Sequence, residues 1–222
     1  MSTAVGKSGI PPLSAPPPNG GSVDSNDTAA SAVVADPTER AVAALLTSLG
    51  IDLANESLAD TPRRVAAAYR ELLSPHEFKA TSFPNEDGSD ELVLVRSIPF
   101  HSLCEHHLLP FFGVAHVGYV PGDRVLGLSK LARVVQACAR GLQIQERLTS
   151  SVADWFVDEL APLGAGVVVQ AQHTCMSIRG VKAIGSSTTT SATRGVLRDD
   201  PARRAEFMQR AEGFGHTAAG WR

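Results

Sequence analysis

Two short segments of this 222-residue chain carry the residue types that bind transition metals. In the first, Cys104 and His107 lie three residues apart, within reach of one ion if the segment turns. In the second, His173-Thr174-Cys175, a predicted strand ends, and strand alternation would place His173 and Cys175 on one face. Two thiolates and one imidazole leave a tetrahedral zinc ion with one open position. The pattern therefore predicts a catalytic zinc ion on Cys104, His107 and Cys175, which would acidify a bound water for hydrolysis.

The two other histidines of these segments, His106 and His173, leave an alternative open. Either one can complete a four-ligand zinc site, and such a closed site would be structural. If neither is a ligand, both are available for proton transfer. The third thiol, Cys138, lies in the apolar helical run 134–139 and is predicted to be a core residue.

A hydrolase also needs groups that hold its substrate. Ser129, Lys130 and Arg133 open a predicted helix, where a hydroxyl, two cations and free N–H groups can cradle a phosphate. Arg179 brings another cation close behind the second metal segment. An ordinary solvated first turn is the alternative explanation for the residues at 129–133.

Gln145 and Glu146 open the next predicted helix. A carboxylate at this place can accept two N–H bonds from an amide-like base edge such as that of guanine. The alternative is that Glu146 only complements the helix dipole.

Hydrophobic periodicity and turn residues outline the elements that must position these groups. Helices are expected at 37–49, from 60 to about 72, at 129–140, at 145–160 and from 200 to about 211, and strands at 92–98, 112–120, 166–176 and 181–191. Asp36 is the expected cap of the first helix. The expected apolar faces of the first two helices are Val42, Leu45, Leu46 and Leu49, and Val65, Ala68, Tyr69 and Leu72. The order is two helices, then ββααββ, then a helix, which is an α+β fold. Residues 1–35 are rich in Pro, Gly, Ser and Ala and are expected to form a disordered tail. Residues 36–215 are expected to form the folded domain, with a helical part at 36–75, a core at 90–197 and a C-terminal helix at 199–212.

Composition excludes several classes of function. The formal net charge of −3 offers no electrostatic footprint for nucleic acid or for an anionic membrane. No apolar run is long enough to span a bilayer, and the first residues lack the layout of a secretory signal. Three cysteines cannot form a disulfide framework. The chain is therefore expected to be cytoplasmic, with neither nucleic acid nor membrane as a partner.

Taken together, four motifs resemble the GTP cyclohydrolase I family, in order and at compatible spacing from about residue 42 to residue 207. They are Phe100-His101-Ser102-Leu103-Cys104-Glu105-His106-His107-Leu108, Gly127-Leu128-Ser129-Lys130-Leu131-Ala132-Arg133, Gln145-Glu146-Arg147-Leu148-Thr149, and His173-Thr174-Cys175-Met176 with Arg179-Gly180. The resemblance implies the tunnelling fold, or T-fold, in which antiparallel ββααββ units assemble into barrels. It further implies an allosteric homodecamer of two stacked pentamers, with active sites between subunits. Assembly would also cover the open edges of a single ββααββ sheet.

The resemblance also assigns roles to residues. Cys104, His107 and Cys175 are the implied ligands of one zinc ion per subunit, whose activated water attacks C8 of GTP. His106 would protonate the ring nitrogen that develops charge, and His173 would act as general acid and base for ring opening and for formate release. The implied product is 7,8-dihydroneopterin triphosphate, the first intermediate of tetrahydrofolate and pterin synthesis. The implied substrate contacts are Gln145 and Glu146 on the guanine edge, Ser129, Lys130, Arg133 and Arg179 on the triphosphate, and Arg64 from a neighbouring subunit.

Two positions depart from the family pattern. Ala67 stands where a triphosphate-binding lysine is usual, and the loss of one charged contact costs about 1–3 kcal/mol of binding. Gly195-Val196-Leu197 replaces a usual Gly-x-Phe, which indicates a change in packing. Two alternatives remain: a relative that opens a purine ring for a specialised pathway or stops at the formamide, and a non-catalytic assembly with structural zinc. A zinc-dependent base deaminase is disfavoured because its Pro-Cys-x-x-Cys element is absent.

Overall fold

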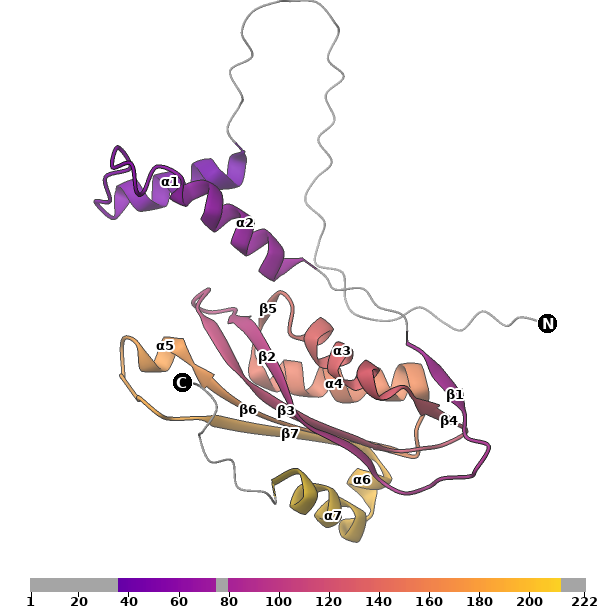
Figure 1. Cartoon of the computed structure of the whole chain (residues 1–222). Coiled ribbons are helices and arrows are strands. Elements are labelled where there is room, and N and C mark those ends of the chain that lie inside the picture. Colours follow the sequence, from indigo (N-terminus) through magenta and orange to yellow (C-terminus); the bar gives the residue numbers. More distant parts are fainter. Residues whose placement is uncertain (1–35, 75–79, 213–222) are drawn as a thin grey trace, which may run out of the picture. The chain divides into compact units, whose positions relative to one another are not determined.

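The computed structural model describes residues 36–74 and 80–212 of the chain (Figure 1). These residues belong to two compact units that divide between Leu72 and Leu73, one with the first two helices and the other with the sheet. The expected tail, residues 1–35, and the last residues of the expected domain, 213–215, lie outside the described ranges. No helix within the described ranges is long and apolar enough to cross a bilayer.

The first unit consists of α1 (Pro37–Ser48) and α2 (Thr61–Leu73). Asp36 caps α1 as the sequence predicts, because its Oδ1 accepts a hydrogen bond from the Thr38 backbone N–H at 2.8 Å. That hydrogen bond lowers the pKa of the Asp36 carboxyl, and the charge of Arg70 on α2 lowers it further. The Asp36 carboxylate therefore caps the start of α1 and also pairs with Arg70 of α2.

The apolar faces expected for α1 and α2 are only partly buried. Leu45 of α1 and its C-cap residue Leu49 are 57% and 68% exposed in this chain. On α2, the fully buried residue is Ala66, whereas Ala68, which we expected on the apolar face, is exposed. The prediction was therefore wrong for Ala68, which does not lie on the buried face of α2.

The second unit contains the sheet and the remaining helices. Its strands are β1 (Ser82–Pro84), β2 (Val93–Cys104), β3 (Pro110–Val120), β4 (Arg124–Leu126), β5 (Leu142–Gln143), β6 (Gly164–His173) and β7 (Thr188–Gly195). Its helices are α3 (Leu128–Cys138), α4 (Gln145–Leu160), α5 (Thr174–Ser177), α6 (Val196–Asp199) and α7 (Pro201–Glu212). The long elements follow the predicted order ββααββ and then a helix, and the α+β class is confirmed.

The main sheet has the strand order β5-β2-β3-β6-β7. Its four long strands are antiparallel neighbours, and β5 adds a parallel pairing of only two residues to the end of β2. The strands β1 and β4 form a separate antiparallel pair. Helices α3 and α4 cover one face of the main sheet, and α6 and α7 lie on the other (Figure 1).

The larger core fills the space between the sheet and the pair α3–α4. Tyr119 of β3 and Phe156 of α4 meet there with ring centroids 5.8 Å apart, and the buried Tyr119 hydroxyl accepts a hydrogen bond from the Leu126 N–H at 2.9 Å. Cys138 is buried in the same core, as predicted, and burial raises the pKa of its thiol to about 12.

The smaller core lies between the opposite face of the sheet and α6–α7. Phe207 of α7 packs directly over Gly166 of β6, where a Cβ would come within 2.7 Å of the ring. Only glycine at this position lets the helix approach so closely. Leu197, one of the residues that departs from the family pattern, is buried in this cluster beside Phe207.

The structure corrects the second predicted strand pair in two places. The strand that we expected at 166–176 ends at His173, because the chain turns into the short helix α5 and Ile178 N–H bonds to Thr174 O at 3.1 Å. The alternation argument for His173 and Cys175 was therefore wrong. The last strand begins at Thr188 rather than at residue 181, since Gly180 and Gly185 adopt positive φ values in the intervening turns.

Candidate metal centre

A tight turn after β2 brings the first two candidate ligands together. The Cys104 N–H donates to Leu109 O at 2.9 Å, and the Leu108 N–H donates to Cys104 O at 2.9 Å. Leu108 has a φ of +56°, in the left-handed region that non-glycine residues rarely occupy. This turn places His107 Nδ1 3.7 Å from Cys104 Sγ.

The end of β6 supplies the third candidate ligand. Because β6 pairs with β3, His173 lies opposite Phe111, and their rings stack at 4.7 Å with an angle of 5° between the planes. The helix α5 then starts at Thr174, whose hydroxyl donates to Pro110 O at 2.5 Å. Cys175 therefore reaches the centre from a helical turn that is fastened to the start of β3.

Cys104, His107 and Cys175 form a three-donor cluster whose ligand atoms all lie within 4.8 Å of one another. Cys104 is buried, Cys175 is half-buried and His107 is exposed. Burial raises the pKa of the Cys175 thiol, the nearby Cys104 raises it further, and the charge of Arg179 acts in the opposite direction. The cluster can hold a metal ion, and two thiols with one imidazole are a donor set that suits zinc.

An ion pair that our sequence analysis did not single out connects this turn to α4. Glu105 pairs with Arg147, and its other oxygen lies 3.7 Å from Nε2 of the exposed His106. Arg147 also donates from Nε to Gln143 Oε1 at 3.0 Å and from Nη2 to Leu142 O at 3.0 Å. The guanidinium thus ties the turn with His106 to β5 and to the first turn of α4.

The start of α4 lies beside the cluster because β5, just before it, pairs with the last residues of β2. Glu146 is exposed there, whereas Gln145 is 2% exposed and its Oε1 lies 2.8 Å from His173 Nε2. Burial lowers the pKa of His173, and the negative charge of Glu146 partly offsets this. We call the turn at 104–109, residues 173–175 and the first turn of α4 the metal end of the molecule.

Comparison with known proteins agrees with this geometry. The sequence profile of the family described as GTP cyclohydrolase I matches residues 38–212. The chain belongs to the GTP cyclohydrolase I family. GTP cyclohydrolase 1 of Halalkalibacterium halodurans is 54% identical over 181 residues, which cover 79% of this chain and 95% of the relative. GTP cyclohydrolase 1 of Bacillus subtilis is 51% identical, with 77% and 92% covered, and that of Mycolicibacterium gilvum is 52% identical, with 77% and 87% covered.

This membership shows that the protein is an enzyme and that its family acts on GTP. The family resemblance stated from the motifs is thereby confirmed. The profile begins within α1 and ends at the last residue of α7, so it spans both compact units.

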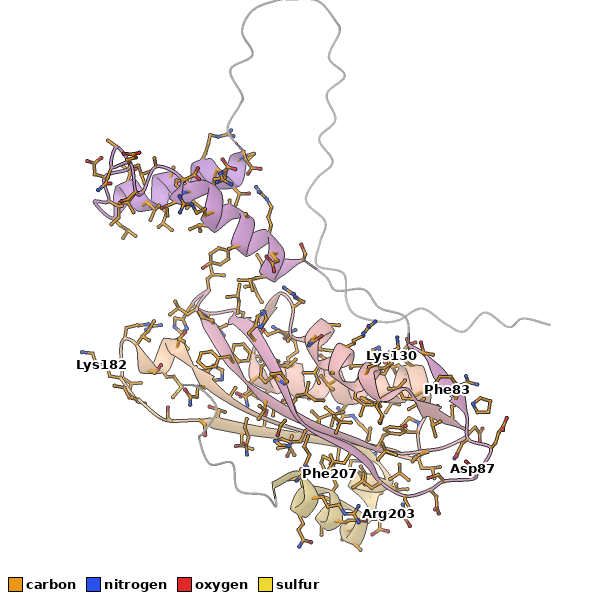
Figure 2. All side chains as sticks on the ribbon, viewed as in Figure 1. Phe83, Asp87, Lys130, Lys182, Arg203 and Phe207 are labelled. Carbon is orange, nitrogen blue, oxygen red and sulfur yellow. The ribbon has the colours of Figure 1, made fainter. Side chains whose placement is uncertain are left out.

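The predicted phosphate contacts of a GTP cyclohydrolase do not all gather at the metal end. Ser129, Lys130 and Arg133 open α3, which starts after β4. Two of the metal ligands, Cys104 and His107, precede the start of β3, and the third, Cys175, follows the end of β6 that pairs with that start. With 11 residues, β3 spans about 35 Å. In Figure 2, Lys130 lies toward β1 and β4, and Lys182, just past α5, lies at the opposite end of the sheet. We call Ser129, Lys130 and Arg133 the cation end.

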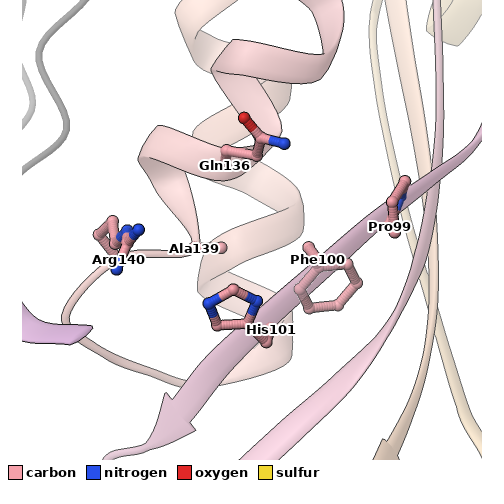
Figure 3. A pocket seen from close by; sticks show the side chains of 6 residues that line it. All are labelled: Pro99, Phe100, His101, Gln136, Ala139 and Arg140. Atoms are coloured by element: carbon pink, nitrogen blue, oxygen red, sulfur yellow. The ribbon is translucent and has the colours of Figure 1, made fainter. Parts of the chain in front are cut away.

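The two remaining predicted cations are placed differently. Arg179 follows α5 and is exposed near Cys175, whose pKa its charge lowers. Arg64 belongs to the helical unit, where it lies 3.5 Å from Asp60. A cavity of about 220 Å³ between β2 and the end of α3 contains none of the predicted GTP cyclohydrolase site residues (Figure 3). It is lined by Pro99, Phe100, His101, Gln136, Ala139 and Arg140.

Proposed function

We propose that this protein opens the imidazole ring of GTP by hydrolysis, releases C8 as formate and forms 7,8-dihydroneopterin triphosphate. The observation that carries the proposal is the three-donor cluster with His173 directly beside it at the metal end. Water is consumed when the ring opens and again when formate leaves, and one water is returned when the rearranged ribose closes onto the pyrimidine. Family membership supports GTP as the substrate.

Cys104, His107 and Cys175 would hold one zinc ion per subunit. The chemistry that zinc supplies with three protein ligands is an acidified water at its open position, together with polarisation of the group being attacked. Neither of the two candidates for a fourth ligand belongs to the cluster. His173 is bonded to Gln145 and stacked on Phe111, and His106 Nε2 lies 3.7 Å from a carboxylate oxygen of Glu105. This arrangement favours an open, catalytic site over a closed, structural one.

The chain's own groups move the protons and hold the base. His106 is exposed on the same turn as His107 and protonates the guanine nitrogen that develops charge. His173 is half-buried beside the cluster, and burial lowers its pKa; it serves as acid and base in ring opening and formate release. Glu146, exposed at the start of α4, accepts the N–H groups of the guanine edge.

The triphosphate is held by cations from more than one copy of the chain. Arg179 lies at the metal end, whereas Ser129, Lys130 and Arg133 lie at the cation end, so a neighbouring subunit supplies them. Arg64 also comes from a neighbouring subunit. We therefore propose that the sheets assemble as in the T-fold, in a decamer of two pentamers, with the edge of β7 in one copy paired to the part of β2 that the short β5 leaves uncovered in the next. The assembled enzyme works in the cytoplasm and is open to allosteric control.

A single assay tests this function. Purified, zinc-loaded protein is incubated with GTP, and formate is measured together with the fluorescent oxidised pterin. Equal amounts of both products are expected. Formate without pterin would favour a relative that stops before ring closure, and no turnover by an assembled, zinc-loaded sample would overturn the enzymatic proposal.

A further inference from the structure

The side chain of Gln145 is an internal amide of the metal end rather than a surface group. It is 2% exposed, at the first residue of α4. Its Nε2 donates to Val169 O at 3.1 Å, to Thr188 O at 2.9 Å and to Thr190 Oγ1 at 3.1 Å. The amide therefore joins α4 to the neighbouring strands β6 and β7.

These contacts fix which atom of the amide faces His173. Two of the three partners are backbone carbonyls, which only accept hydrogen bonds, so the amide atom that faces them is the nitrogen. Its two hydrogens are shared among three acceptors, which uses its whole donor capacity. The oxygen, Oε1, is left facing His173 Nε2 at 2.8 Å.

The tautomer of His173 follows from this orientation. A carbonyl oxygen only accepts, so His173 must donate from Nε2, and in the neutral imidazole Nδ1 then carries the lone pair. On one of its faces the ring stacks against Phe111. The stacking on Phe111 thus fixes the plane of the imidazole, and the bond to Gln145 fixes which ring nitrogen carries the proton.

The surrounding hydroxyls hold the amide in place. Thr149 Oγ1 donates to Gln145 O at 2.7 Å and lies 2.6 Å from Thr190 Oγ1. Because the hydrogen of Thr149 is already used, Thr190 donates to Thr149 and its oxygen accepts from Gln145. The chain Thr149–Thr190–Gln145–His173 runs in one direction, and each of its members is buried or half-buried.

We propose that Gln145 is a positioning residue, which holds His173 in the Nε2–H tautomer and in one orientation, and that it does not bind the guanine base. This inference rests on the proposed role of His173 in proton transfer. It leaves recognition of the guanine edge to Glu146, whose side chain is exposed next to it. A buried amide without spare donors has nothing to offer a ligand.

The main test is Gln145→Met, which keeps the length of the side chain and removes both amide atoms. We expect kcat to fall about 10- to 100-fold, the usual loss when a partner that orients a working histidine is removed. KM for GTP and the zinc content are expected to stay within about twofold of wild type. A raised KM with unchanged kcat would overturn the proposal, because that result marks a base-binding residue.

Equilibrium binding gives a readout that does not depend on turnover. In a His173→Ala background, Gln145→Met is expected to leave the dissociation constant for GTP unchanged, since its partner has already been removed. An increase of tenfold or more in that background would assign Gln145 to the substrate. A crystal structure of Gln145→Met is expected to contain the His173 ring in more than one orientation.

A milder variant keeps the proposal testable if Gln145→Met does not fold. Thr190→Val removes one acceptor of the amide and is expected to lower kcat about two- to fivefold at constant KM, because the amide is held less firmly. The matched control is Thr193→Val, the same change at another buried position of β7 that is not among the partners of Gln145. Equal effects of the two variants on kcat would overturn the proposal.

The wild-type assay separates the two proposals. If the zinc-loaded wild type produces no formate from GTP, the proposed function fails. If the wild type turns over and Gln145→Met changes only KM, the function stands and the positioning role alone is rejected.

Discussion

The metal end and the cation end are built in opposite ways. At the metal end, a turn, a strand end and a helix start are bonded to one another through Glu105–Arg147, Thr174–Pro110 and Gln145–His173. At the cation end, the side chains of Ser129, Lys130 and Arg133 make no hydrogen bond or ion pair to any part of the chain that the structure describes. The groups of the metal end are bonded to one another within one chain, whereas the side chains of the cation end have no such bonds among the described residues.

This difference indicates how the work of the site is divided. Groups that carry out chemistry must be held to within a fraction of an ångström, and a single chain provides that by internal hydrogen bonding. Groups that hold a flexible, highly charged triphosphate need charge more than rigidity, and they can come from another copy. Substitutions at the metal end and at the cation end can test this division of roles.

The largest effect is expected from breaking the metal end. Cys175→Ser should lose zinc, and activity should fall about 10³-fold or more, because the water is no longer acidified. Metal content by mass spectrometry and formate release measure the two effects. The matched control is Cys138→Ser, a buried thiol in the main core, which should keep its zinc. Activity retained by a zinc-free Cys175→Ser protein would contradict a metal mechanism.

Removing the proposed proton carrier His173 from the metal end should lower turnover without loss of zinc. His173→Ala is expected to keep zinc and to lose about 10²- to 10⁴-fold in turnover, since general acid–base catalysis contributes on that scale. His101→Ala, on the exposed side of β2, serves as the histidine control. Zinc lost together with activity in His173→Ala would instead indicate that His173 is a fourth ligand.

The cation end is expected to affect binding. In the double variant Lys130→Ala/Arg133→Ala, KM for GTP should rise about 100-fold, because each charged contact contributes about 1–3 kcal/mol. Zinc content should not change. Steady-state kinetics and metal analysis distinguish this pattern from that of the metal-end variants.

Assemblies that contain both a metal-end variant and a cation-end variant test whether the two ends of one site come from different subunits. Cys175→Ser and Lys130→Ala/Arg133→Ala subunits, dissociated and reassembled together, should regain activity, because about a quarter of the sites would combine an intact metal end with an intact cation end. No recovery in a verified mixed assembly would mean that each chain completes its own site.

The smallest effect is expected outside both ends, on the helical unit. Ala67 is exposed on α2, so a lysine fits there without repacking. Ala67→Lys should lower KM for GTP about fivefold by restoring one charged contact. Ala68→Lys, the same change at the next exposed position, is the control for charge alone. An equal decrease in both variants would show that only net charge matters.

Much of the fold follows from short-range patterns in the sequence. The cap at Asp36, the helix from Gln145 to Leu160 and the burial of Cys138 were all predicted, because each depends on neighbouring residues or on a long apolar period. The helical turn at 174–177 was missed, since the residues there suit a strand and the bond from Thr174 to Pro110, which holds the turn, joins residues distant in the sequence.

The site was predictable in its residue types but not in its connections. Cys104, His107 and Cys175 were proposed from donor chemistry, and the structure brings them together. The bonds of Gln145 to β6 and β7 could not be anticipated, because they join residues that are distant in the sequence. The separation of Lys130 from the metal end likewise depends on the length of β3, which the local motif does not encode.

The two-residue strand β5 has a consequence for the order in which the molecule folds. Its parallel pairing with Leu103 and Cys104 joins segments far apart in the sequence and is too short to be stable alone. We therefore expect it to form late, after the β2–β3 hairpin and the helices α3 and α4 that flank it. Because this pairing brings Gln145 and Glu146 to the cluster, the site is expected to become complete only near the end of folding.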